Sequence, residues 1–362
     1  MIPYARQDIN EDDIRAVTDV LRSDYLTQGA AIEKFERAVA QYCGAQYAVA
    51  VSNATAALHL ACLAAELGDG DILWTSPNTF VASANCALYC GAHPHFVDID
   101  PVTYNLNVDA LEAALSFAKQ SGKLPKIIVP VHFAGQSCDM ERISTLAQQY
   151  GFTVIEDASH AIGGRYKNTR IGSCSFSDMT VLSFHPVKII TTGEGGMILT
   201  NNPNLYQRLV LLRSHGITRD PARMEGTPDG SWYYQQVELG FNYRMTDIQA
   251  ALGTSQMQRI DAFVARRQYL AQRYDNLLTD LPVSLPSRCD YAHSAYHLYV
   301  IRLRLNLIQK SHKQVFEELR ENGIGVNLHY IPVHMHPYYQ RLGFQRGDFP
   351  EAEQYYKEAI SL

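Results

Sequence analysis

The chain has 362 residues, of which 46% are apolar, 19% are charged and 10% are aromatic. This composition is that of an ordinary folded protein with length for about two domains, and it excludes disordered and fibrous classes. The formal net charge of −6 provides no basic field for a phosphate backbone. No lysine- and arginine-rich stripe with interleaved aromatic residues occurs either, so nucleic acid is not an expected partner.

The N-terminal stretch MIPYARQDINEDDI is polar and acidic, without the basic start and apolar run of a secretory signal. Apolar runs such as KIIVPVHFAG are far shorter than the ~20 residues of a membrane span. We therefore expect a cytoplasmic protein with no membrane partner. The seven cysteines include no C-x-x-C pair, which suits free thiols in a reducing compartment. Cys86 and Cys90 lie one helical turn apart, so a shared metal is the alternative, although we expect no metal.

The first two thirds of the chain alternate short apolar runs with helix-like stretches. Continuous apolar strands separated by helices indicate a mostly parallel sheet that is covered on both faces, which is an α/β architecture. The runs predict strands at 48–52, 71–76, 95–100, 126–133, 152–158, 179–184 and 195–200, and helices at 55–68, 79–92, 108–119 and 139–150.

The pattern changes at about residue 202, where a polar segment with turn signals begins. A long amphipathic helix is predicted over 246–278, and the proline-bearing stretch LPVSLPS indicates a hinge into a smaller domain. That domain has a predicted strand at 295–303, a helix at 313–323 and a histidine-rich segment. We expect a large domain over 1–250, followed over 251–362 by the linking helix and a small C-terminal α/β domain.

One loop, SFHPVKIITTGEGG, carries Lys188 between two predicted buried strands. Loops that are held by a rigid sheet are where functional groups collect. A lysine that is partly withdrawn from water loses some preference for the ammonium form, and its free amine can attack a carbonyl to form a Schiff base. The plain alternative is a solvated surface charge.

Asp157 ends the buried strand FTVIED, where an acid is often a helix cap or a turn former. At the mouth of a parallel sheet, such a carboxylate can also keep a pyridinium nitrogen protonated, which makes a pyridine ring an electron sink. The stretch SNATAALHLA starts a helix near Ala54, and the free N–H groups of a helix start bind phosphate. Asn53 as a simple N-cap is the alternative there.

Ser183 can add a hydrogen bond to that phosphate, and Phe80 can stack on a flat ring, although a phenylalanine alone is more often a core residue. An amine, a carboxylate, a helix start and an aromatic face together describe pyridoxal 5'-phosphate.

With these residues placed, the chain closely resembles the DegT/DnrJ/EryC1/StrS family of sugar-nucleotide aminotransferases, which have fold type I of pyridoxal phosphate enzymes. The resemblance rests on LTQG, SNATAALHLA, EDASHAIGG, SFHPVKIITTGEGG, LRSHGITRD and LGFNYRMTDIQAALG. It implies that Lys188 forms the Schiff base and that Asp157 binds the pyridinium nitrogen. It further implies phosphate contacts from Ala54, Thr55 and Ser183, stacking by Phe80, and an Asn242 that reaches the cofactor phosphate of the neighbouring subunit in a homodimer with shared active sites.

His160 stands where many family members have glutamine, and the lysine loop reads FHPVK. Both features resemble the branch of pseudaminic acid biosynthesis. That branch uses L-glutamate to aminate C4 of a UDP-4-keto-6-deoxy-N-acetylhexosamine, UDP-2-acetamido-2,6-dideoxy-β-L-arabino-hexos-4-ulose. The resemblance implies a place for His160 near the phenolic oxygen of the cofactor. It also implies substrate contacts from Tyr4, Leu26, Thr27, Gln28, Gly29, Asn327, Leu328, His329 and Tyr330.

Three alternatives stay open. A transaminase for another nucleotide-linked 4-keto sugar, of the viosamine or perosamine type, fits the same motifs, and a non-catalytic binder of cofactor or sugar is a different class. A metal at His329, His334 and His336 is the third. A 3-dehydratase of the same fold is disfavoured, because such relatives have histidine where Lys188 stands. Family members usually continue past the segment that ends at Leu362 into a final helix.

Overall fold

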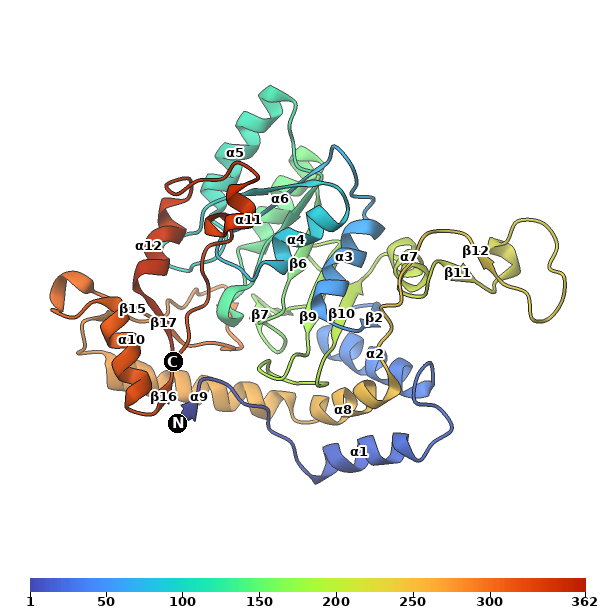
Figure 1. The fold of residues 1–362 in the computed structure, drawn as a ribbon, viewed down its shortest axis with the longest axis horizontal. Helices are drawn as coiled ribbons and strands as arrows, with labels where there is room; N and C mark the ends of the chain where they lie inside the picture. The colour runs from blue at the N-terminus through green and yellow to red at the C-terminus, as the bar shows by residue number, and fades with distance from the viewer.

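The computed structural model describes residues 1–362, and a seven-stranded sheet lies at its centre (Figure 1). Its strands are β2 (Tyr47–Val51), β3 (Ile72–Thr75), β4 (His93–Phe96), β5 (Ile127–Val129), β6 (Thr153–Asp157), β9 (Met179–Ser183) and β10 (Gly196–Thr200). They follow the order β2-β10-β9-β6-β5-β3-β4 across the sheet. β10 is antiparallel to both of its neighbours, and the other neighbouring strands are parallel. The predicted mostly parallel sheet is therefore confirmed.

Helices cover both faces of this sheet, because both faces of its strands are apolar. In β2, Ala48 and Ala50 join the core on one face, whereas Val49 and Val51 join the core on the other. The first face is covered by α2 (Ala30–Cys43), α5 (Val108–Ser121), α6 (Met140–Tyr150) and α8 (Asp247–Met257). The second face is covered by α3 (Ala54–Ala64), α4 (Ala82–Tyr89) and α7 (Pro203–Arg213).

One edge of the sheet collects the segments that matter for function. Because β2 and β9 are both antiparallel to β10, they run parallel to each other and to β6, β5 and β3. The carboxyl ends of all these strands therefore meet at one edge, which is where open α/β sheets bind ligands. Asp157 and Ser183 are the last residues of β6 and β9.

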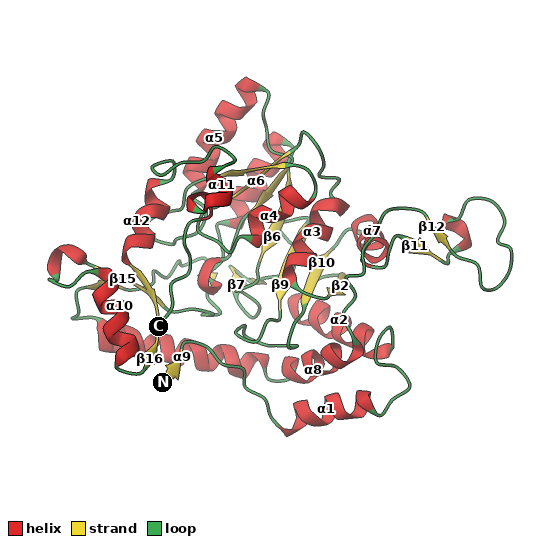
Figure 2. Cartoon of the chain, viewed as in Figure 1, coloured by secondary structure: helices red, strands yellow, loops and turns green.

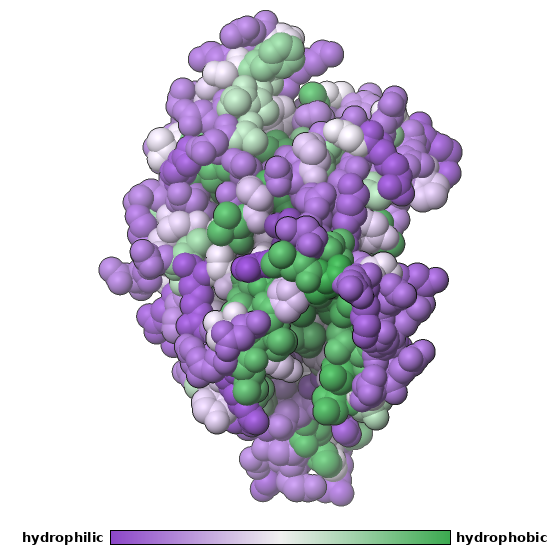
Figure 3. Space-filling model, turned by 90° about the vertical axis from the view of Figure 1, so that its left-hand side faces the viewer, coloured by the Kyte–Doolittle hydropathy of each residue, from purple (hydrophilic) through white to green (hydrophobic).

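A smaller antiparallel sheet of β13 (Val283–Ser284), β15 (Val300–Leu303) and β17 (Ala359–Ser361) forms the C-terminal part. Its core is partly open, since Val283, Ile308 and Phe316 pack against its buried residues but are themselves only partly buried. Figure 3 shows the side of the molecule that carries α5, α10 and α12, where apolar side chains gather in a band between polar margins. The helices of this part are α9 (Ile260–Leu278), α10 (His312–Glu321), α11 (Pro337–Gln340) and α12 (Pro350–Glu358).

The two chain ends lie close together in this part of the molecule (Figure 1). β1 (Ile2–Pro3) pairs with β16 (Ile324–Gly325), and Asn327 pairs with Ser361. The predicted boundary at residue 250 falls inside α8. At the other end of the predicted large domain, β1 pairs with the C-terminal part. The division at residue 250 stays a prediction.

Two segments differ from the sequence prediction. The helix predicted over 246–278 is two helices, α8 and α9, because Arg259 leaves the helix between them, where its guanidinium binds Asp8 and Asp13. Tertiary contacts here override local propensity. The polar segment after residue 202 also begins with the unpredicted helix α7, although Asn202 as N-cap followed by Pro203 is a known start signal.

The remaining elements are peripheral, and the secondary structure is summarised in Figure 2. A hairpin of β11 (Ile217–Thr218) and β12 (Gln235–Gln236) projects from the body beyond α7 (Figure 1). No helix combines the length and apolar character that a membrane span requires. The other elements are α1 (Glu11–Leu21), β7 (Arg165–Tyr166), β8 (Thr169–Arg170) and β14 (Ala292–His293).

Candidate active site

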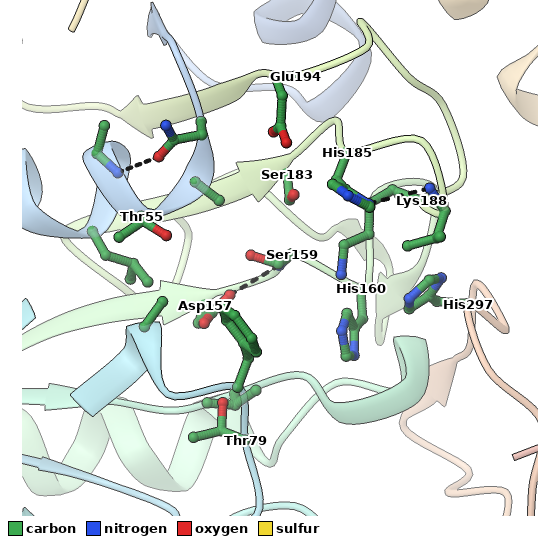
Figure 4. A pocket seen from close by; sticks show the side chains of 18 of the residues that line it. Thr55, Thr79, Asp157, Ser159, His160, Ser183, His185, Lys188, Glu194 and His297 are labelled. Carbon is green, nitrogen blue, oxygen red and sulfur yellow. Dashed lines mark hydrogen bonds between the residues drawn. The ribbon is translucent and has the colours of Figure 1, made fainter. Parts of the chain in front are cut away.

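A cavity of about 870 Å³ opens at the carboxyl edge of the large sheet (Figure 4). Its walls come from the ends of the parallel strands, the start of α3, the loop between β9 and β10, and the C-terminal part. Ten of the predicted site residues line it together: Tyr4, Ala54, Thr55, Phe80, Asp157, His160, Ser183, Lys188, His329 and Tyr330.

Lys188 lies on the predicted loop between two paired, buried strands, and its side chain lines the cavity. Its amine makes no ion pair or hydrogen bond with the rest of the chain. The backbone N–H of Lys188 donates to the carbonyl of His185. Burial lowers the pKa of Lys188 to about 8, and the charge of Asp157 acts in the opposite direction. About a tenth of the amine is therefore neutral and nucleophilic at pH 7.

Asp157 is buried at the end of β6, and its two carboxylate oxygens are oriented by separate hydrogen bonds. The hydroxyl of Ser83 donates to Oδ2 at 2.7 Å. The backbone N–H of Ser159 donates to Oδ1 at 3.1 Å (Figure 4). A carboxylate that faces a cavity without a basic side chain bonded to it has the geometry to bind a cationic ring nitrogen.

The start of α3 presents free backbone donors at the cavity wall. The side chain of Asn53 accepts from Ala56 N–H and its carbonyl accepts from Ala57 N–H, which leaves the N–H groups of Ala54 and Thr55 for a ligand. Asn53 is therefore an N-cap, and the phosphate site beside it stays a prediction. Gly196 allows this arrangement, because a Cβ there would lie 2.5 Å from the carbonyl carbon and oxygen of Asn53.

His160 is buried beside Lys188 and bonded at both ring nitrogens. Ala134 N–H donates to its Nδ1 at 3.3 Å, and its Nε2 lies 3.1 Å from the hydroxyl of Tyr330. Burial, and then the charge of Lys188, hold the pKa of His160 well below its usual range, so the ring is neutral. Since Nδ1 accepts a hydrogen bond, Nε2 carries the proton and donates to Tyr330.

Aromatic residues form the rest of the wall. Phe80 is 56% exposed, so it is not a core residue, and its ring lies 6.2 Å from that of Tyr330. The ring of Tyr4 lies 5.4 Å from that of His329, whose Nδ1 is 2.9 Å from the hydroxyl of Ser361. Burial and the charge of Lys188 lower the pKa of His329 to about 4.

Several predicted residues do not line this cavity. The LTQG residues Leu26, Thr27, Gln28 and Gly29 lie at the start of α8, where Asp247 accepts from Gly29 N–H at 2.8 Å. Asn242 is exposed outside the cavity, Asn327 pairs with Ser361 of β17, and Leu328 donates its N–H to Oδ1 of Asn327. Their predicted contacts with substrate, or with the cofactor of a neighbouring subunit, stay predictions.

The sequence reading missed other lining residues, among them Thr79, Ser159, His185, Glu194, Tyr243 and His297. His297 lies in the stretch 295–303 for which the sequence predicts a strand, but β15 begins only at Val300. A histidine inside an apolar run was the one signal that could have identified it.

No group of three potential metal ligands lies close enough to bind a metal ion. Of the histidines considered, His334 pairs with Glu353 at 3.0 Å, and His329 belongs to the cavity wall. Cys86 is fully buried in the core between α3 and α4, and its thiol donates to the carbonyl of Ser83.

The residues present fit pyridoxal 5'-phosphate. An unpaired amine, an oriented carboxylate and a helix start with free N–H groups face one cavity, next to the exposed face of Phe80. Together with the mostly parallel sheet, they define a pyridoxal-phosphate-dependent transferase of fold type I.

The chain belongs to the DegT/DnrJ/EryC1/StrS aminotransferase family, whose model matches residues 7–362. It is 40% identical to the spore coat polysaccharide biosynthesis protein SpsC of Bacillus subtilis, with 100% of this chain and 91% of the relative covered. It is 38% identical to a UDP-4-amino-4,6-dideoxy-N-acetyl-beta-L-altrosamine transaminase of Campylobacter jejuni, with coverage of 100% and 92%.

Solved structures agree with this assignment. PseC from Helicobacter pylori, an aminotransferase of pseudaminic acid biosynthesis, superposes with a TM-score of 0.89 at 31% identity, covering 100% of this chain and 93% of PseC. Spr1654 from Streptococcus pneumoniae in its pyridoxamine phosphate form has a TM-score of 0.89 at 31% identity, covering 100% and 94%, and it has also been solved in its pyridoxal phosphate form. The predicted family, fold and cofactor are thus confirmed, and the protein is a sugar aminotransferase.

Proposed function

We propose that the protein transfers an amino group from L-glutamate to C4 of UDP-2-acetamido-2,6-dideoxy-β-L-arabino-hexos-4-ulose, in pseudaminic acid biosynthesis. The observation that carries this proposal is the unpaired, partly neutral amine of Lys188 in one cavity with Asp157 and His160. The likeness to the Campylobacter transaminase and to PseC supports the choice of sugar.

The cofactor, when bound, supplies an electron sink that stabilises negative charge at the carbon that loses a proton. Asp157 would hold its ring nitrogen in the protonated form, and Ala54, Thr55 and Ser183 would bind its phosphate. Phe80 would cover one face of its ring. Lys188 would be the residue that bonds to its aldehyde.

Proton transfer falls to Lys188. Its Nζ would accept the proton from the α carbon of glutamate in the first half of the reaction and deliver a proton to C4 of the sugar in the second half. The neutral His160, which donates to Tyr330, would set the hydrogen bonding at the phenolic oxygen of the cofactor. Tyr4, His329 and Tyr330 would contact the sugar nucleotide.

The remaining contacts require a second copy of the chain. The residues that line the cavity include no arginine and no lysine besides Lys188, although both substrates are anionic. A homodimer with shared active sites, in which Asn242 and the LTQG segment reach the neighbouring cavity, would complete the site. A cytoplasmic location agrees with this assignment.

A second substrate is favoured by one observation, since SpsC is as similar to the chain as the Campylobacter transaminase is. The alternative is another nucleotide-linked 4-keto-6-deoxy sugar of the viosamine or perosamine type. A catalytically inactive binder of cofactor or sugar is less consistent with an intact set of Lys188, Asp157 and Ser183.

The test is turnover of purified UDP-4-keto sugars, epimeric at C5, with L-glutamate, with the amino sugar identified by mass spectrometry and NMR. We expect preference for the L-configured ketone. Preference for the D-configured ketone would replace our substrate with the alternative. A yellow protein that keeps its colour when glutamate is added would instead favour the inactive binder.

A further inference from the structure

Three imidazoles surround Lys188 in the cavity, those of His160, His297 and His329. Burial lowers the pKa of all three, and the charge of Lys188 is the next cause in each case. The lysine is therefore near all three rings, and all three are uncharged at neutral pH. Figure 4 shows the rings of His160 and His297 side by side below Lys188.

His297 differs from the other two because its ring makes no hydrogen bond. His160 uses both nitrogens, and His329 uses Nδ1. The side chain of His297 is 4% exposed, and its Nδ1 has no partner. Buried polar groups without partners are rare and unfavourable, so each calls for an explanation.

The position of His297 is fixed by its backbone and by its neighbours. Nη1 of Arg267 donates to the carbonyls of Tyr296 and His297, both at 3.1 Å. Gly135 has a φ of +105°, and a Cβ there would lie 3.0 Å from His297 N. The ring centroid lies 4.4 Å from that of His160. Tyr296, directly before His297, has a φ of 47°, and such backbone conformations cluster at functional sites.

The amine of Lys188 makes no hydrogen bond either. An imidazole ring in either neutral tautomer has one lone pair that accepts from an amine or ammonium. The two groups are unpaired in this structure, and we propose that His297 is a positioning residue that accepts a hydrogen bond from Nζ of Lys188 once the substrate has displaced this amine from the cofactor. This role of His297 rests on the proposed role of Lys188. His297 would hold the amine in place between the two half reactions.

The experiment uses the full chain loaded with pyridoxamine 5'-phosphate, a form in which the amine of Lys188 is free, and two variants of His297. His297→Phe keeps an aromatic ring against His160 but removes both nitrogens, whereas His297→Gln keeps an acceptor. Limiting acetic anhydride acylates the neutral amine of Lys188, and peptide mass spectrometry gives the pH midpoint of this reaction.

An acceptor stabilises the ammonium form, so its loss lowers the midpoint. We expect His297→Phe to lower it by about one pH unit, and His297→Gln to stay close to wild type. An unchanged midpoint in His297→Phe would overturn the proposal, as would an equal shift in both variants. If His297→Phe does not fold, judged by circular dichroism, His297→Leu provides the same comparison with Gln.

His95 supplies the matched control. It packs on Trp74 with 5.3 Å between ring centroids, on edge strand β4, so His95→Phe and His95→Gln should leave the midpoint unchanged. Borohydride reduction of the cofactor-loaded wild-type protein separates the two proposals. A cofactor fixed elsewhere than at Lys188 refutes the proposed function, whereas a cofactor fixed at Lys188 leaves the midpoints to decide about His297.

Discussion

The Nε2 of His160 lies 3.1 Å from the hydroxyl oxygen of Tyr330, although 170 residues separate them in the sequence. His160 follows the end of β6 in the large sheet, whereas Tyr330 belongs to the C-terminal part. Because the backbone N–H of Ala134 occupies Nδ1, the hydrogen bond runs from His160 to Tyr330, and the tyrosine hydroxyl stays free to donate into the cavity.

This pair predicts how the absorbance of the bound cofactor responds to pH. In Tyr330→Phe, the N–H of His160 loses its acceptor inside the chain and turns to the ligand. We therefore expect the pH titration of the absorbance to shift, and to shift again in His160→Ala. His160→Gln retains a donor and should restore a titration close to wild type. Titrations that are identical in all four proteins would contradict a role for His160.

Lys188→Ala removes the only amine of the cavity wall. We expect no borohydride-reducible bond to the cofactor, and a loss of turnover of roughly 10²-fold or more, because a positioned acid and base contributes about 10²–10⁴-fold. Lys167→Ala, which removes an exposed partner of Glu141, is the control and should keep full activity. The same adduct in Lys188→Ala would show that another amine bonds to the cofactor.

Asp157→Asn should reduce turnover far more than Ser83→Ala. The neutral amide cannot stabilise a positive ring nitrogen, whereas loss of the Ser83 hydroxyl removes only one of two bonds that orient the carboxylate. For Ser83→Ala we expect a decrease of about tenfold, the equivalent of 1.4 kcal/mol and one hydrogen bond. Steady-state rates with L-glutamate compare the two variants. Equal losses of turnover would argue against a role for the charge of Asp157.

The rate of cofactor attachment should rise with pH through about 8, because burial lowers the pKa of Lys188 to that value and only the neutral amine attacks an aldehyde. The charge of Asp157 raises this pKa, so Asp157→Asn should move the inflection to lower pH. Stopped-flow mixing of cofactor-free protein with pyridoxal 5'-phosphate measures the inflection in wild type and in Asp157→Asn. An inflection that moves upward in Asp157→Asn would refute the electrostatic account.

Residues next to strand ends were the ones that the sequence could place. Asp157, Ser183 and Lys188 follow directly from apolar runs, because the carboxyl ends of parallel strands converge whatever the details of the helices. His297 could not be placed in this way, since its role depends on Arg267 and Gly135, which approach it only in the folded chain.

The same limit explains the errors in the fold. The 246–278 pattern is periodic throughout, and only the tertiary contacts of Arg259 with Asp8 and Asp13 reveal its break. Likewise, the sequence of the LTQG motif does not say whether it contacts the cavity of its own chain or the cavity of a neighbouring copy.

Stability of the cofactor-free protein should fall as the pH drops below about 6.5. Burial lowers the pKa of His329 from 6.5 to about 4, so between these values the unfolded chain binds a proton that the folded chain does not. The contribution of His329 to the free energy of unfolding is complete above pH 6.5 and is lost as the pH falls to about 4. The loss is at most ~3 kcal/mol. The pKa values of His160 and His297 are lowered too, so both act in the same direction.

Urea unfolding at pH 7.5 and pH 5 measures this loss, and His329→Gln isolates the contribution of one ring. Glutamine can still bond to Ser361, so the variant should fold, and its stability should decrease less than that of wild type between the two pH values. His93→Gln, on the exposed side of β4, controls for loss of an ordinary histidine. Because protonation of carboxylates destabilises all three proteins alike, the difference between them is the test. An equal decrease in wild type and His329→Gln would mean that His329 accepts a proton in the folded protein without cost.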